Sequence, residues 1–81
     1  MNAQEVAEAR LKAEMDRLEK DFTYHPPKPG QTVRYEAIRA QAKQYARFIL
    51  DNTIPSREQS TALTKLDEVV FWANAAIARN E

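Results

Sequence analysis

The chain has 81 residues, equal numbers of acidic and basic side chains, and no cysteine. This length allows one small domain, and without disulfides or thiolate metal sites we expect oligomerisation to supply additional buried area. A formal net charge of zero argues against a protein that binds DNA or RNA polymers through phosphate charge alone.

The N-terminal segment and the hydropathy pattern bear on location. No apolar run approaches the roughly 18 residues that span a membrane. The start, MNAQEVAEARLKAEM, is charged throughout and does not resemble a signal peptide. We therefore expect no membrane partner, and the lack of cysteine fits an intracellular protein.

Residues 2–21 predict a helix, because good helix formers dominate the segment. Its apolar stripe is thin and consists of Leu11, Met15, Leu18 and Phe22. Such a helix is marginal on its own, so we expect it to depend on docking.

Residues 23–30, TYHPPKPG, predict an irregular connector. Three prolines and one glycine exclude a helix or a central strand here. The prolines also make the loop stiff, so Tyr24 and His25 have little conformational freedom, and we expect both to be ligand-binding residues.

Residues 32–51 predict a second helix. Its apolar stripe is formed by Tyr35, Ile38, Ala42, Tyr45 and Ile49, with Ala46 and Phe48 beside it. Arg39, Lys43 and Arg47 are successive i, i+4 neighbours and make one basic ridge. The ridge lies in the basic part of the chain, since residues 22–50 carry five basic side chains against one glutamate. Such a local positive field can hold a small anion.

Residues 56–80 predict a third helix, which starts with a capping box of Ser56 and Gln59. The apolar stripe of this helix consists of Leu63, Leu66, Val70, Ala73 and Ile77. Phe71 and Trp72 widen the apolar face beyond what a two-helix contact needs, and Asn74 interrupts a run of small apolar residues. With three short helices, a subunit interface explains this excess at least as well as an intrachain core.

The expected fold is therefore all-α: a short N-terminal helix (1–21) followed by an antiparallel two-helix hairpin (22–81), within a single domain. The connection DNTIP at 51–55 is short enough to make the second and third helices antiparallel neighbours. We expect this unit to assemble as a homo-oligomer.

Catalytic chemistry has no support in the sequence. There is one histidine and no cysteine, and no spacing fits a nucleophile with its base, a metal-binding pair or a phosphate loop. His25 could act as an acid or base, but a lone histidine before a proline more often has a structural role. We expect no enzyme, no cofactor and no metal, and the missing metal ligands disfavour a phosphodiesterase.

Two candidate anion sites remain, each with a plainer alternative. Tyr24 offers an aromatic face, and Arg39, Lys43 and Arg47 offer charge-assisted hydrogen bonds, the combination that a nucleotide requires. The alternative is a solvated basic face with Tyr24 packed on the hairpin. A second polar, basic cluster begins the third helix, where helix N-termini favour anions; it contains Arg57, Ser60, Thr61, Thr64 and Lys65. Its alternative is an ordinary capped, solvated first two turns.

Three blocks of sequence resemble a known family. FTYHPP at 22–27, RYEAIRAQAK at 34–43 and SREQSTALTKLDEVVFWANAAIAR at 56–79 resemble the helical hairpin of phage anti-CBASS sponges. A related hairpin occurs in the phage anti-Thoeris sponge. The resemblance covers about residues 22–80 and does not extend with the same clarity over residues 1–21.

The resemblance implies a compact homo-oligomer, in that family a hexamer, which sequesters cyclic dinucleotides such as cyclic GMP–AMP without cleaving them in the cytoplasm of the infected bacterial host. It implies that Tyr24 stacks on a base and that Arg39 or Lys43 holds phosphate. A second kind of site, for cyclic trinucleotides, would draw on Arg57, Ser60, Thr61, Thr64 and Lys65. The alternative function is a structural or protein-interaction hairpin with no small-molecule ligand.

Overall fold

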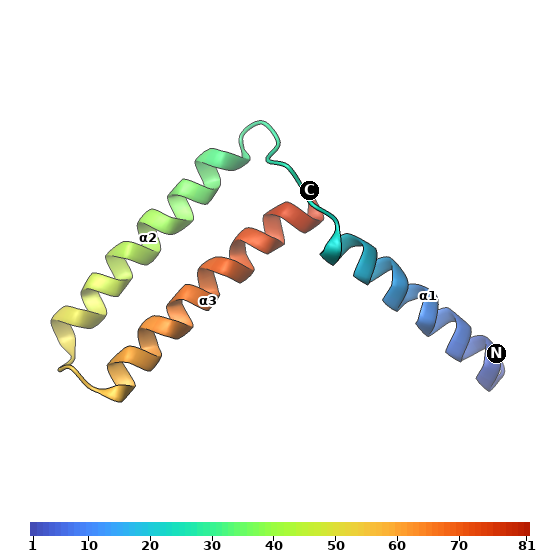
Figure 1. Ribbon diagram of the computed structural model, residues 1–81, viewed down its shortest axis with the longest axis horizontal. Coiled ribbons are helices and arrows are strands. Elements are labelled where there is room, and N and C mark those ends of the chain that lie inside the picture. Colours follow the sequence, from blue (N-terminus) through green and yellow to red (C-terminus); the bar gives the residue numbers. More distant parts are fainter.

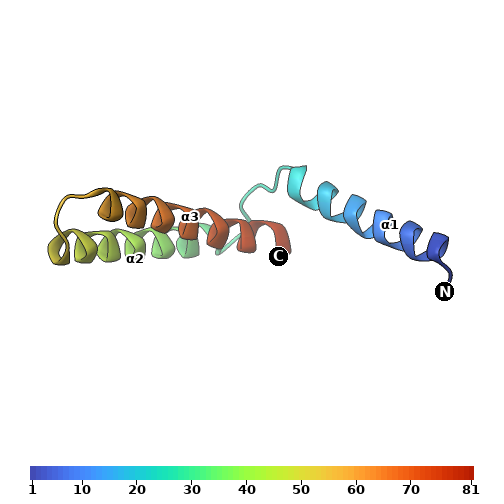
Figure 2. The same ribbon diagram turned by 90° about the horizontal axis from the view of Figure 1, so that it is seen from below.

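The computed structural model describes residues 1–81 and contains three helices and no strand. These are α1 (Ala3–Phe22), α2 (Gln31–Asn52) and α3 (Arg57–Asn80). α2 and α3 lie antiparallel as a hairpin, joined by a tight turn at one end, whereas α1 projects from the open end of the hairpin (Figures 1 and 2). The predicted all-α fold is confirmed, and each predicted helix boundary lies within one residue of the observed one.

α1 forms a complete helix that meets its own hairpin only at its last turn, where Lys20 and Asp21 contact the end of α3. Asn2 caps it, since the Asn2 side-chain oxygen accepts a hydrogen bond from the Glu5 backbone N–H at 2.8 Å. Extensive contacts between helices occur between α2 and α3 alone. The radius of gyration is therefore 18.5 Å, against about 12 Å for a compact domain of this length. The docking expected for this helix is not made within one chain.

The contact between α2 and α3 is made by small and medium apolar side chains. Ile77 is the one buried apolar residue, with 6% of its surface exposed. The predicted α3 stripe is confirmed, because Leu63, Leu66, Val70 and Ala73 are all half-buried.

The predicted α2 stripe is wrong at one position. Tyr45 is 57% exposed, whereas Ala46 is half-buried in its place. Ala46 lies four residues after Ala42, so two small side chains follow each other along the contact line and let the helices approach closely. Tyr45 lies at the edge of the contact.

The start of α3 keeps half of the predicted capping box. Ser56 Oγ accepts a hydrogen bond from the Gln59 backbone N–H at 3.1 Å. The Gln59 side chain does not return to Ser56; its Nε2 donates to Thr53 Oγ1 at 2.9 Å. The glutamine amide therefore braces the turn instead, because the turn backbone offers it acceptors that the sequence pattern does not reveal.

Removing this cap should measurably weaken the hairpin. We expect Ser56→Ala to lower the free energy of unfolding by about 1 kcal/mol, since an N-cap serine satisfies a backbone N–H that alanine cannot. The measurement is urea unfolding followed by circular dichroism at a fixed protein concentration. Ser60→Ala, at a helix position with no side-chain hydrogen bond, is the matched control, and equal losses in both variants would contradict the capping role.

The open end of the hairpin is ordered by the connector. Gly30 has a φ of 85°, in the left-handed region that favours glycine. Gln31 is the one buried polar residue; its Oε1 accepts from the Lys28 backbone N–H at 2.9 Å. The Gln31 backbone N–H donates to the Lys28 carbonyl at 3.0 Å. These paired bonds fix the turn into α2.

A bidentate ion pair closes this end of the hairpin. Arg34 donates from Nη1 and Nη2 to the two carboxylate oxygens of Glu81 at 2.6 and 2.9 Å. Lys28 Nζ donates to the Glu81 carbonyl oxygen. The hydrogen bond from Arg34 holds the pKa of Glu81 below its ordinary range. The end of α3 is thereby joined to the start of α2.

This ion pair should make the hairpin acid-sensitive. Because the pKa of Glu81 is lowered by folding, its contribution is fully present above the ordinary glutamate pKa of about 4.3 and is lost as pH falls through the folded-state pKa. We expect the wild type to melt at a higher temperature than Glu81→Gln at neutral pH, and the difference to disappear in acid. A difference that persists after Glu81 is protonated would contradict this role.

Candidate ligand-binding groove

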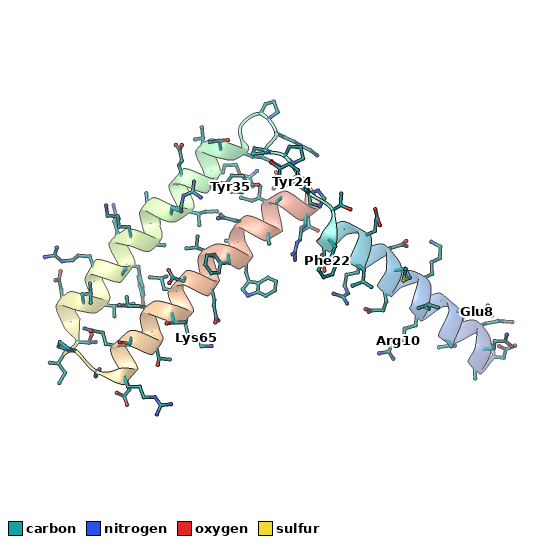
Figure 3. The ribbon with its side chains drawn as sticks, in the orientation of Figure 1. Glu8, Arg10, Phe22, Tyr24, Tyr35 and Lys65 are labelled. Atoms are coloured by element: carbon teal, nitrogen blue, oxygen red, sulfur yellow. The ribbon has the colours of Figure 1, made fainter.

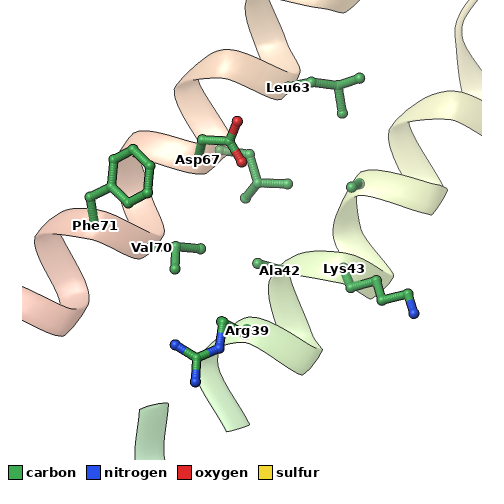
Figure 4. Close-up of a pocket in the computed structure, with 9 residues that line it drawn as sticks. Arg39, Ala42, Lys43, Leu63, Asp67, Val70 and Phe71 are labelled. Carbon is green, nitrogen blue, oxygen red and sulfur yellow. The ribbon is translucent and has the colours of Figure 1, made fainter. Parts of the chain in front are cut away.

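A hollow with a volume of about 490 Å³ lies between α2 and α3. Its floor is apolar and includes Ala42, Leu66 and Val70. Arg39 and Lys43 contribute to the lining from α2, and Asp67 and Phe71 contribute from α3. In Figure 4 the end of the Lys43 side chain extends away from α3. The groove thus combines cations, a carboxylate and an aromatic ring over an apolar base. Ala46 and Leu63 complete its lining.

The basic ridge predicted on α2 divides into two parts. Arg47 Nε donates to Asp51 Oδ1 at 2.9 Å, so its charge is already paired. Arg39 and Lys43 form no ion pair within the chain, and both line the groove. The structure therefore brings two of the three predicted cations to one hollow and leaves Arg47 outside it.

Phe71 and Asp67 are groove residues that the sequence did not identify as a site. Phe71 is 67% exposed, and it lies one helical turn after Asp67. Counting equal distances from the turn along the two antiparallel helices places Val70 opposite Arg39, and Phe71 is the next residue along α3. An exposed aromatic ring beside unpaired cations provides a surface on which a base can stack.

Tyr24, which the sequence grouped with the basic ridge, lies on the connector at the open end of the hairpin (Figure 3). Its side chain is 80% exposed, so the alternative in which it packs against the hairpin is not observed. Tyr24 does not line the groove of Arg39 and Lys43 in the same chain.

The neighbouring His25 has a structural contact. Its Nε2 lies 2.7 Å from the carbonyl oxygen of Lys20, in the last turn of α1. Because the carbonyl can only accept, Nε2 donates this bond. His25 thus satisfies a free carbonyl at the end of α1 and holds the connector next to it.

The second predicted cluster is only partly assembled. Arg57 and Thr61 line a shallow hollow of about 490 Å³ near the turn, together with Glu58 and Ala62. Thr61 Oγ1 donates to the Arg57 carbonyl oxygen at 2.8 Å, and Thr64 Oγ1 donates to the Ser60 carbonyl oxygen at 3.1 Å. Lys65 Nζ lies 3.5 Å from Glu68 Oε2. Ser60, Thr64 and Lys65 do not line the hollow.

Asn74 occupies an unusual position beside the main groove. Its Oδ1 is a buried side-chain atom without a hydrogen-bond partner. The residue lines a smaller hollow of about 280 Å³ with Tyr35, Arg39 and Ala75. Arg39 thus borders both hollows.

The structure also limits other kinds of site. No group of three or more histidine, cysteine, aspartate or glutamate side chains is arranged to hold a metal ion. None of the three helices combines the length and the apolar character needed to cross a membrane.

Comparison with known proteins gives one match. Residues 14–78 match the family described as Acb2/Tad1, hairpin domain, which covers the end of α1, the connector and nearly all of the hairpin. No curated protein matches the chain. No solved structure matches it either. The match spans most of the sequence, so the chain belongs to the Acb2/Tad1 hairpin family of anti-CBASS and anti-Thoeris sponges, which bind cyclic oligonucleotides.

Proposed function

We propose that this protein sequesters cyclic dinucleotides such as cyclic GMP–AMP without cleaving them, and so blocks bacterial CBASS signalling in the cytoplasm of the infected host. The observation that carries the proposal is the groove between α2 and α3, where Arg39 and Lys43 have no ion-pair partner and Phe71 is exposed beside them. Family membership gives the ligand class.

The chemistry of the groove suits such a ligand. A cyclic dinucleotide carries two phosphates and two bases, so it requires cations next to stacking surfaces. Arg39 offers a planar fork that can bind phosphate oxygens in pairs, and Lys43 offers a compact charge. Sequestration requires affinity and abundance and no catalytic group.

We further propose that the ligand site is shared between chains of a homo-oligomer, with a hexamer as the assembly expected for the family. Tyr24 of one chain would stack on a base while Arg39 or Lys43 of another holds phosphate, which explains why Tyr24 does not line the groove of its own chain. Each phosphate and each base of a symmetric ligand would then meet its own cation and tyrosine. Arg57 and Thr61 remain the core of a candidate second site for cyclic trinucleotides.

The exposed surface supports assembly. The chain exposes 6823 Å², against about 5,000 Å² for a compact monomer of this mass. The excess of about 1,800 Å² on one chain is roughly twice the 800 Å² or so that each partner buries in a standard-size protein interface. The alternative function, a hairpin that binds another protein, uses the same surface but leaves Arg39 and Lys43 without a role.

Substitution of Arg39 tests the phosphate contact. We expect Arg39→Ala to weaken cyclic GMP–AMP binding by roughly 10-fold or more, because a charge-assisted hydrogen bond contributes about 1.5–3 kcal/mol. The shift in melting temperature on adding ligand should shrink accordingly. Arg10→Ala, on the exposed surface of α1 and without an ion pair, should leave binding unchanged. Equal affinities for the wild type and Arg39→Ala would remove Arg39 from the site.

A further inference from the structure

α1 is a helix whose apolar side chains are mostly exposed, with Leu18 the half-buried exception. Val6, Leu11 and Met15 are 51%, 63% and 57% exposed, and Phe22 is 83% exposed. A 20-residue helix without tertiary contacts is marginal in water. The first part of this helix also lies outside the family match, which begins at residue 14. For α1 to be stable, its exposed apolar side chains must therefore be buried against another surface.

The junction prevents that surface from being the chain's own hairpin. Lys20 Nζ donates to Asn80 Oδ1 at 3.0 Å, and Arg79 Nη1 lies 3.6 Å from Asp21 Oδ1. Lys20 lies two positions after Leu18, and so on the opposite face of α1. When Lys20 reaches the end of α3, the apolar stripe consequently faces away from it. The proline connector and the His25 contact keep this arrangement stiff.

The hairpin has an apolar groove that could bury the apolar side chains of an α1 helix. It has a volume of about 470 Å³ and lies between α2 and α3. Seven of its eight lining residues are hydrophobic, among them Ile38, Tyr45 and Val69, and Gln41 is the polar one. It shares its floor residues Ala42, Leu66 and Val70 with the groove of Arg39 and Lys43. The two grooves thus lie on the two faces of the helix pair, so covering one leaves the other open.

The shape of the chain allows two copies to cover each other. α1 and the hairpin diverge from the junction as two arms (Figure 1). At 1.5 Å per residue, α1 is about 30 Å long and the hairpin helices about 33–36 Å. Consider a second copy that is rotated by 180° about the line that bisects the two arms. Its α1 then runs along the direction of the first copy's hairpin, and its hairpin runs along the direction of the first copy's α1. Two copies stacked in this way lay α1 of each along the hairpin of its partner, an isologous arrangement.

The register of this arrangement matches the apolar residues. Leu11 precedes the end of α1 at Phe22 by the same number of residues as Ala42 follows the start of α2 at Gln31. Val69 precedes the end of α3 at Asn80 by that number as well. With the junctions aligned, Leu11 therefore reaches the groove at Ala42 and Val69.

The charges of the two arms are complementary. α1 carries six carboxylates and four basic side chains, a net charge of −2. α2 carries four basic side chains and two carboxylates, a net charge of +2. Net charges of opposite sign attract α1 to a hairpin at long range and disfavour pairing of α1 with a second α1. The unpaired cations Arg39 and Lys43 line the other groove, so the contact at the apolar groove itself is uncharged.

We propose that two copies of this chain exchange their N-terminal helices, so that the Leu11–Met15 stripe of each α1 fills the Ile38–Val69 groove of the partner's hairpin. The exchange covers two apolar surfaces that one chain cannot bring together. It does not involve Tyr24, Arg39 or Lys43, and it is independent of any ligand. Its failure would leave the proposed cyclic-nucleotide binding untouched.

Cross-linking of the ligand-free protein tests the exchange. Because the native chain has no cysteine, Leu11→Cys combined with Val69→Cys gives two defined thiols. Treatment with a short bis-maleimide should give a covalent dimer, and so should an equal mixture of the two single variants. Leu11→Cys with Ser60→Cys, near the turn end of α3, should give none. A link formed within one chain, or no link in the Leu11–Val69 pair, would overturn the proposal.

Sedimentation equilibrium provides a second readout that does not depend on thiols. Leu11→Gln with Met15→Gln should lower the mass of the assembly by at least half at micromolar concentration. Ala9→Gln with Ala13→Gln changes the opposite face of the same helix and should keep the wild-type mass. A monomeric wild type, or equal masses in both double variants, would contradict an interface at this stripe.

Discussion

Tyr24→Ala is expected to abolish most of the affinity for cyclic dinucleotides while leaving the fold intact. The side chain is 80% exposed and forms no hydrogen bond within the chain, so its removal costs little stability. Stacking of a base on an aromatic ring contributes about 1–3 kcal/mol per base. If two tyrosines of a shared pocket each hold one base, the loss is roughly 30-fold or more.

Tyr24→Phe separates stacking from hydrogen bonding. The phenylalanine ring keeps the stacking face and loses the hydroxyl group, so we expect it to keep most of the affinity in isothermal titration. An alanine variant that binds as tightly as the wild type would exclude Tyr24 from the site. A phenylalanine variant as weak as alanine would instead assign the role to the hydroxyl group.

Ile77→Ala is expected to cause the largest loss of stability. Ile77 is 6% exposed and is the one buried apolar side chain of the hairpin. Truncating a buried isoleucine to alanine costs about 2–5 kcal/mol, through lost transfer free energy and the cavity left behind. That is a large fraction of the total stability of a small domain.

The turn provides a matched control for this substitution. Ile54 is 78% exposed, and Ile54→Ala should change the free energy of unfolding by no more than about 0.5 kcal/mol. Urea unfolding of both variants at one protein concentration makes the comparison. Similar midpoints for Ile77→Ala and the wild type would mean that the contact between α2 and α3 does not hold the hairpin together.

Features set by local sequence could be predicted. The helix ends depend on Asn2, Ser56 and Gly30, and each acts on residues a few positions away. The antiparallel hairpin follows from the shortness of its turn. The α3 stripe follows from its period, because Leu66, Val70 and Ile77 face one neighbour only.

Features set by contacts between distant residues could not be predicted. Arg34 and Glu81 are 47 positions apart, so no local sequence pattern predicts their ion pair. Whether Tyr45 or Ala46 lies on the contact line of α2 depends on how closely the two helices approach each other. The basic ridge was identified by its spacing, but the pairing of Arg47 with Asp51, which leaves Arg39 and Lys43 as the groove cations, required the side-chain geometry.

Isothermal titration of cyclic GMP–AMP into the wild-type protein, followed by denaturation and recovery of the nucleotide, tests sequestration most directly. We expect saturable binding below micromolar concentration, one ligand for every two chains, and recovery of the intact cyclic nucleotide. No measurable heat at micromolar concentrations would contradict binding of this ligand, and recovery of a linear or cleaved product would contradict sequestration without catalysis.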